Sequence, residues 1–308
     1  GAARYALARG DRAEAAELWP LVEWCLEYCR RQLTPDGVVA SDTDELEGRF
    51  PTGDANLCTS TLYYDALLSA VSLGRELGVE SAQTARYAAQ ARALARAIDA
   101  YFGGEVGGYD TYRYYAGNTL LRSWICMPLI VGLKERSEGT VRALLGPELM
   151  TDDGLLTQQG SSTFWDRSTL YALRGIYNVG QADRATELLH RYSQRRLLGD
   201  HVPYPIEAWP EGSQRHLSAE SGLYCRIITE GLFGIRPTGL RSFDLTPSMP
   251  AAWESMSLRH IRAFGSDFDI TVARVADGRL RITVARPGAK PKIYRAAPGA
   301  TIRVKLTD

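Results

Sequence analysis

The chain changes its hydrophobic period once, and this change limits the folds that it can adopt. Up to about residue 235, apolar residues recur every three or four positions, which is typical of amphipathic helices. After the Gly- and Pro-bearing segment 234–237 they alternate with polar residues, which is typical of half-buried strands. We therefore expect a helical domain over residues 1–237 and a small antiparallel β domain over residues 238–308.

The helical part consists of periodic segments separated by Gly- and Pro-bearing loops. Helices are predicted at residues 13–33, 57–77, 81–102, 118–134, 138–146, 163–179, 182–197 and 217–233. Short turns and longer, aromatic-rich loops alternate between them. A ring of helical hairpins produces this alternation, so the sequence predicts a mainly α fold, an (α/α) toroid of helical hairpins.

The last part of the chain contains three clear alternating segments. They lie at residues 268–272, 280–284 and 302–306, and residues 276–279 have the composition of a hairpin turn between the first two. We expect a cap of antiparallel strands on the helical domain.

Composition excludes several partner classes. Lys+Arg and Asp+Glu both total 36, so no charge excess recruits nucleic acid or an anionic membrane. No apolar run approaches the roughly 18 residues of a membrane helix.

The five cysteines and four histidines show no metal-ligand spacing, so we expect packing thiols, no metal and no organic cofactor. The chain begins without Met and without a signal peptide, which leaves its localisation unknown.

The first candidate site is the loop at residues 40–50, between two predicted helices. It gathers several acids beside an arginine, with one more acid just behind them: Asp42, Asp44, Glu45, Glu47, Arg49 and Asp54. Any single acid here can be a helix cap or a solvated loop residue. Like charges repel one another, however, so a crowd of carboxylates favours a functional reason.

The second candidate site is the loop at residues 203–213. Glu207 and Glu211 flank Trp209, and three prolines stiffen the backbone. A Trp ring can stack on a sugar face while a carboxylate acts at the anomeric carbon. A packing role for Trp209 is the alternative. Trp165 lies in another aromatic run that could form a sugar-binding wall or part of the core.

Two stretches resemble a known family. Residues 218–237 resemble the last barrel helix of six-hairpin glycosidases and disaccharide phosphorylases, and residues 245–253, with a proline pair and a Trp, resemble their strand entering the C-terminal cap. Residues 53–64, an acidic loop followed by a Tyr-rich helix, resemble the branch that includes processing α-glucosidase and trehalase. The resemblance implies a six-hairpin toroid. Fewer than twelve helices are predicted, so the first hairpins are expected to be missing.

The resemblance also implies roles for residues of both loops. Residues 207–212 are similar to the loop that carries the catalytic base of that branch, which makes Glu207 the candidate base. The candidate acid is Asp44 or Glu47, kept protonated by the neighbouring carboxylates. Trp209 and Trp165 would stack on sugars, and Arg49 would contact hydroxyls or brace the loop.

The sequence therefore predicts a glycoside hydrolase that acts on an oligosaccharide or glycoside, with inversion of configuration. Asp54 and Glu211 are further substrate-binding candidates. Two alternatives stay open: a disaccharide phosphorylase on the same fold, in which phosphate replaces the activated water, and a non-catalytic carbohydrate-binding or scaffold module. The oligomeric state is not predicted.

Overall fold

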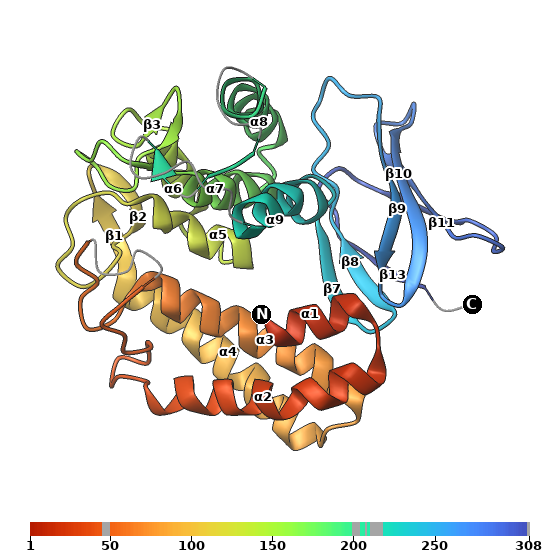
Figure 1. Ribbon diagram of the computed structural model, residues 1–308, viewed down its shortest axis with the longest axis horizontal. Coiled ribbons are helices and arrows are strands. Elements are labelled where there is room, and N and C mark those ends of the chain that lie inside the picture. Colours follow the sequence, from red (N-terminus) through yellow and green to blue (C-terminus); the bar gives the residue numbers. More distant parts are fainter. Residues whose placement is uncertain (45–49, 199–203, 207, 210–217, 307–308) are drawn as a thin grey trace. The chain divides into compact units, whose positions relative to one another are not determined.

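The computed structural model describes residues 1–44, 50–198, 204–206, 208–209 and 218–306 of the chain. Figure 1 shows helices along most of the sequence and strands gathered in its last part, coloured blue. A helical part with antiparallel β-sheets is thus confirmed. Closure of the helices into a toroid is not tested by these elements and stays a prediction.

The helices follow the periodic segments of the sequence closely. The predictions at 13–33, 57–77 and 81–102 match α2, α3 and α4 to within two residues. The described helices are α1 (Ala2–Arg9), α2 (Arg12–Arg31), α3 (Leu57–Leu77), α4 (Ser81–Phe102), α5 (Met127–Val131), α6 (Ser137–Leu144), α7 (Asp166–Asn178), α8 (Ala182–Arg196) and α9 (Ser218–Arg226), with the 3-10 helix η1 (Ser123–Cys126) and the π-helix η2 (Ile227–Leu232).

Two features differ from the sequence predictions. The helix predicted at residues 118–134 is wrong over its first part: helix begins only at η1 and continues as α5, which has Pro128 in its first turn. The expectation of packing thiols holds for Cys58 and Cys126, which are buried, but it is wrong for Cys25 and Cys225, which are exposed.

The strands form small antiparallel sheets. They are β1 (Gly103–Val106), β2 (Tyr109–Tyr112), β3 (Met150–Thr151), β4 (Gly154–Leu155), β5 (Phe164–Trp165), β6 (Ala208–Trp209), β7 (Ile235–Gly239), β8 (Ser242–Leu245), β9 (Ser255–Ala263), β10 (Ser266–Arg274), β11 (Leu280–Ala285), β12 (Lys292–Ala296) and β13 (Ile302–Lys305). The three predicted strands are confirmed as β10, β11 and β13, and the predicted turn joins β10 to β11.

The chain divides into two compact units. The first consists of Gly1–Tyr28, Asp65–Ala91 and Leu232–Asp308, and the second of Cys29–Tyr64 and Arg92–Gly231. Each unit therefore combines segments that are distant in sequence.

In the first unit, one sheet has the strand order β12-β11-β10-β9 and the other the order β13-β8-β7. Their inward residues form an aromatic core. The ring of Phe243 on β8 stacks on those of Phe264 and Phe268, at centroid distances of 5.0 and 5.5 Å. All three rings are buried. Alternate residues of β10 are buried too, which is why its sequence alternates.

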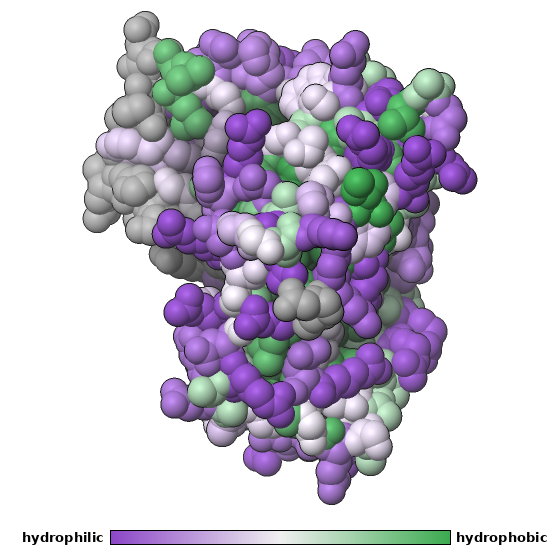
Figure 2. Space-filling view, turned by 90° about the vertical axis from the view of Figure 1, so that its right-hand side faces the viewer, coloured by the Kyte–Doolittle hydropathy of each residue, from purple (hydrophilic) through white to green (hydrophobic). Residues whose placement is uncertain are grey.

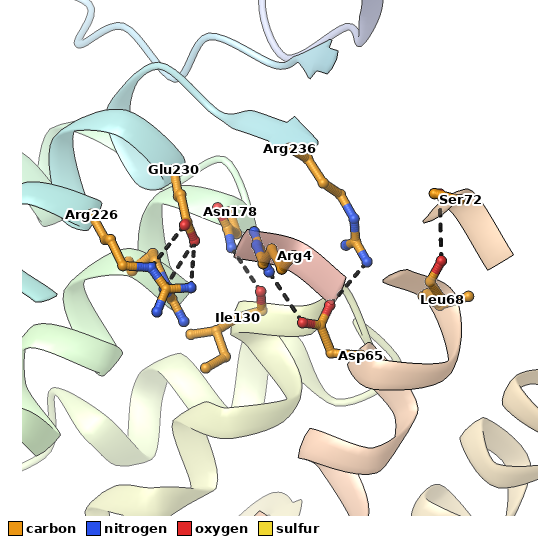
Figure 3. A network of polar contacts seen from close by, with 10 residues as sticks. Arg4, Asp65, Leu68, Ser72, Ile130, Asn178, Arg226, Glu230 and Arg236 are labelled. Carbon is orange, nitrogen blue, oxygen red and sulfur yellow. Dashed lines mark hydrogen bonds and ion pairs between the residues drawn. The ribbon is translucent and has the colours of Figure 1, made fainter. Parts of the chain in front are cut away.

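Helix α1 is tied to this β structure within the first unit. The amide of Phe264 donates to the carbonyl of Ala8, and Asp65 on α3 accepts hydrogen bonds from Arg4 on α1 (3.2 Å) and Arg236 on β7 (3.1 Å), as Figure 3 shows. One carboxylate thus joins three elements of the first unit.

The second unit is built around α7, which contacts α5, η1, α8 and α9. Glu230 on η2 accepts hydrogen bonds from Arg174 on α7 (2.9 Å) and Arg226 on α9 (2.7 Å). Figure 3 shows Glu230 beside Arg226. This charge network fixes the π-helix against α7. It also gives Arg174, which is 4% exposed, an acidic partner for its buried charge.

The surface drawn in Figure 2 is mostly hydrophilic, with hydrophobic side chains in scattered groups rather than in one broad patch. Such scattered groups are ordinary on folded proteins. In the described ranges, no helix is both long enough and apolar enough to span a membrane.

Candidate functional site

The first acidic loop is anchored through Asp44. The hydroxyl of Tyr114 donates a hydrogen bond of 2.6 Å to Oδ2 of Asp44. Tyr114 is buried with 0% of its surface exposed. Burial is the main cause that raises the pKa of Tyr114, with smaller effects from Cys58 and Asp44. The phenol therefore stays protonated, and Asp44 is the acceptor in this contact.

Backbone contacts hold both ends of the same loop. The Asn56 side-chain amide donates to the carbonyl of Thr43 (3.0 Å), and the Thr52 hydroxyl donates to the carbonyl of Asp42 (2.8 Å). Asp54 has an exposed side chain, and its carbonyl accepts the amide of Ser41. Hydrogen bonds therefore fix the backbone on both sides of the loop. Glu45, Glu47 and Arg49 lie outside the described residues.

A buried arginine lies behind Tyr114. The guanidinium of Arg122 sits 4.8 Å from the Tyr114 ring, 5.3 Å from Phe50 and 5.6 Å from Tyr115. Arg122 is 1% exposed, and its Nε donates to Gln158 at 3.0 Å. Burial lowers the pKa of Arg122, while the nearby Tyr114 and Asp44 oppose that effect. Three aromatic rings thus hold a cation beside the acidic loop.

The second loop is held by a two-residue strand pair. In β5 and β6, Phe164 pairs with Trp209 and Trp165 pairs with Ala208. Glu207 itself lies outside the described residues, as does Glu211. The neighbours of Glu207, Ile206 and Ala208, are both described, and Ala208 pairs with Trp165 on β5.

A buried ion pair fixes the residue before Glu207. The amide of Ile206 donates to Oδ2 of Asp166 at 2.7 Å, and Nη2 of Arg196 lies 3.0 Å from Oδ1 of the same carboxylate. The side chains of Asp166 and Arg196 are 2% and 3% exposed. The pKa of the adjacent Tyr192 is raised, first by burial and then by the charge of Asp166. One carboxylate of a buried ion pair thus accepts a backbone amide of the second loop.

The two loops belong to the same unit, and backbone pairing connects Arg122 to the strand of the second loop. Arg122 pairs with Gln158, Leu156 pairs with Phe164, and Phe164 pairs with Trp209. This series runs from the arginine beside the first loop to the strand of the second loop.

The structure describes the two predicted sugar-stacking residues, Trp165 and Trp209, to different extents. Trp165 is 1% exposed, with the guanidinium of Arg167 at 5.7 Å from its ring, so it packs as a core residue and presents no open face. Trp209 has a described backbone in β6, and the structure describes nothing of its side chain.

Sequence reasoning missed four residues that support the loops: Tyr114, Arg122, Asp166 and Arg196. The only signal for Asp166 was its position after Trp165 at a helix start. No periodic pattern in the sequence indicates that Tyr114, Arg122 and Arg196 contact these loops. In the described ranges, no three His, Cys, Asp or Glu side chains gather as a possible metal site.

The chain matches no protein-family model and no curated protein sequence. It is similar in structure to a sialidase, at a TM-score of 0.68 and 16% identity, over 96% of this chain and 31% of that chain. It is also similar to a GH78 family rhamnosidase of Bacillus sp. GL1, at a TM-score of 0.60 and 16% identity, over 96% and 31% of the two chains. An α-L-rhamnosidase from Dictyoglumus thermophilum gives a TM-score of 0.52 at 13% identity, over 90% and 32%. This chain spans about a third of the length of these glycosidases and shares their fold over that span.

Proposed function

We propose that the chain is part of a glycoside hydrolase that cleaves a glycosidic bond with two carboxylates. The solved structures that share its fold are named for enzymes of sialic acid and rhamnose, which supports a carbohydrate substrate. Residues 1–237 would carry the catalytic site on a six-hairpin toroid, and residues 238–308 would form its cap. One fold can carry many functions, so the chemistry has to come from the two loops.

The observation that carries the proposal is the buried contact of Ile206, the residue before Glu207 in the chain. Burying Asp166 and Arg196 costs desolvation energy, and the pair adds little net stability compared with apolar residues. Its specific effect is to hold the amide of Ile206, one residue before Glu207. A catalytic base has to be held within a fraction of an ångström of its working position, and a fixed neighbouring residue supports the choice of Glu207 as that base.

For the acid, the contacts of Asp44 favour Glu47. A general acid must donate its proton to the leaving oxygen. Asp44 already accepts the hydrogen bond of Tyr114 and lies near the charge of Arg122, and both contacts suit an ionised carboxylate. In this proposal Asp44 anchors the loop, and Glu47 protonates the leaving group.

Glu207 would activate a water molecule on the opposite face of the sugar, which inverts the anomeric configuration. Inversion requires a separation of roughly 6.5–9.5 Å between the two carboxyl groups. Trp209 would stack on the sugar, while Arg49, Asp54 and Glu211 would contact hydroxyl groups.

The test is reducing-sugar release from a panel of glycosides that includes α-L-rhamnosides and sialosides, with and without phosphate. The parent chain is compared with Glu207→Gln and with Glu254→Gln, an exposed acid of the first unit, as the matched control. We expect turnover that needs no phosphate, is lost in Glu207→Gln and is kept in Glu254→Gln.

Other outcomes would replace this proposal. Turnover that requires phosphate would make the chain a phosphorylase. Binding of glycans without turnover, unchanged in Glu207→Gln, would make it a carbohydrate-binding module.

A further inference from the structure

Two adjoining hollows in the second unit lie against α6 and α8. One has a volume of about 690 Å³ and the other about 460 Å³, and both are lined by Arg142 and Arg184. Because they share these two residues, we treat them as one feature, the arginine groove. Its other polar residues include Tyr109, Glu138, Glu187 and Arg191.

The two shared arginines keep their charges available. The guanidinium of Arg142 lies 5.8 Å from the Tyr109 ring, and Tyr109 donates to Glu148 at 3.1 Å, which holds the ring in place. Arg184 donates to the side-chain oxygen of Gln181 at 3.1 Å. Within the part of the chain that the structure describes, neither arginine forms an ion pair with an acid.

A neighbouring arginine shows the contrast. Arg191, on the rim of the same groove, pairs with Asp152 at 3.0 Å. The charge of Arg191 is therefore already matched, whereas the charges of Arg142 and Arg184 face the hollow that they share.

The chemistry of the lining restricts the ligand. Two guanidinium groups from different helices suit a carboxylate, which accepts paired hydrogen bonds from arginine. Three acids, Glu138, Asp183 and Glu187, also line the hollows and balance the three arginines. A polyanion such as nucleic acid would be repelled by those acids. Sugar hydroxyls, in contrast, can donate hydrogen bonds to them.

We propose that the arginine groove binds an acidic saccharide, with the carboxylate of one sugar unit between Arg142 and Arg184. None of the described residues of the two acidic loops lines either hollow. The proposed binding role of the groove therefore uses none of those described loop residues, and it does not depend on the proposed catalytic role of Glu207.

The probe is a disaccharide that ends in glucuronic acid, compared with the same disaccharide ending in glucose, in calorimetric titrations. The parent chain should bind the acidic probe at least tenfold more tightly than the neutral one. The double variant Arg142→Gln/Arg184→Gln should lose that difference. Arg281→Gln, an exposed arginine on β11 of the other unit, is the matched control and should keep it.

Arg142→Lys/Arg184→Lys keeps the charge without the planar fork, and we expect it to bind the acidic probe more weakly than the parent does. Circular dichroism melts would establish that each variant is folded.

Glu207→Gln should leave binding unchanged, which separates this proposal from the proposed function. Equal binding of the two probes, no binding of either, or full displacement by an equal concentration of inorganic phosphate would overturn the assignment.

Discussion

Asp166 and Arg196 form an ion pair in the interior of the second unit, with 3.0 Å between Oδ1 and Nη2 and with both side chains almost fully buried. The other oxygen of the carboxylate accepts the amide of Ile206. One acid on α7 therefore connects α8 to the loop that carries Glu207.

Asp166→Ala should lower the free energy of unfolding by about 3–5 kcal/mol, because it leaves the Arg196 charge buried without its partner. Urea denaturation measures the change. Asp152→Ala removes an acid from an exposed ion pair with Arg191 and should change stability little. If both substitutions changed the free energy of unfolding equally, the buried pair would contribute no more to stability than the exposed one.

Tyr114→Phe should destabilise the chain by about 1.5–3 kcal/mol, since it removes a hydrogen bond to a charged acceptor. It should also lower glycoside turnover by releasing the Asp44 loop. Tyr294→Phe, on β12, has no hydroxyl contact among the described residues and is the control. If both variants unfolded at the same urea concentration as the parent, the Tyr114–Asp44 contact would not anchor the loop.

The chain should lose stability above about pH 10. The pKa values of Tyr112, Tyr114 and Tyr192 are all raised, mainly by burial. In the unfolded chain a tyrosine ionises near pH 10, so above that pH the folded state binds more protons and stability falls as pH rises. Each group contributes up to about 1.4 kcal/mol per pH unit. Urea denaturation at pH 9, 10 and 11 measures the slope, and a flat profile would contradict it.

Gly10→Ala should destabilise the first unit more than Gly288→Ala does. Both glycines have positive φ, 76° and 74°, so alanine strains the backbone at either position. At Gly10 the new Cβ would also overlap the backbone of Phe264 and Gly265, whereas at Gly288 it would meet open space. The difference between their melting temperatures isolates the overlap. Equal melting temperatures would mean that α1 moves freely away from the sheet.

The parts of the fold that a single period specifies could be predicted from the sequence. One side of each long element is buried, so its apolar residues recur with the period of a helix or a strand. This holds for the helices α2, α3 and α4 and for the strands β10 and β11. The hairpin of β1 and β2 was missed, because its strands are four residues long and its Gly-rich start gives no alternation. The periodicity at residues 118–134 predicted a longer helix than the backbone forms, because helix begins only at η1.

Only the two candidate loops could be proposed from the sequence, because clustered acids and a Pro-rich, Trp-bearing segment stand out in it. That these loops form a site stays a prediction. The contacts that hold them, Tyr114 to Asp44 and Arg196 to Asp166, join residues 70 and 30 positions apart. No local pattern encodes such pairs, because they form only when the tertiary fold brings the residues together.

The most direct test of the central claim, that Glu207 is the base of a glycoside hydrolase, is chemical rescue of Glu207→Gly with sodium azide on an aryl glycoside that the parent chain hydrolyses. The account predicts that the variant is inactive, that azide restores release of the aryl group, and that the product is a glycosyl azide of inverted configuration. Undiminished hydrolysis by the variant without azide, or a product of retained configuration, would contradict the role of Glu207.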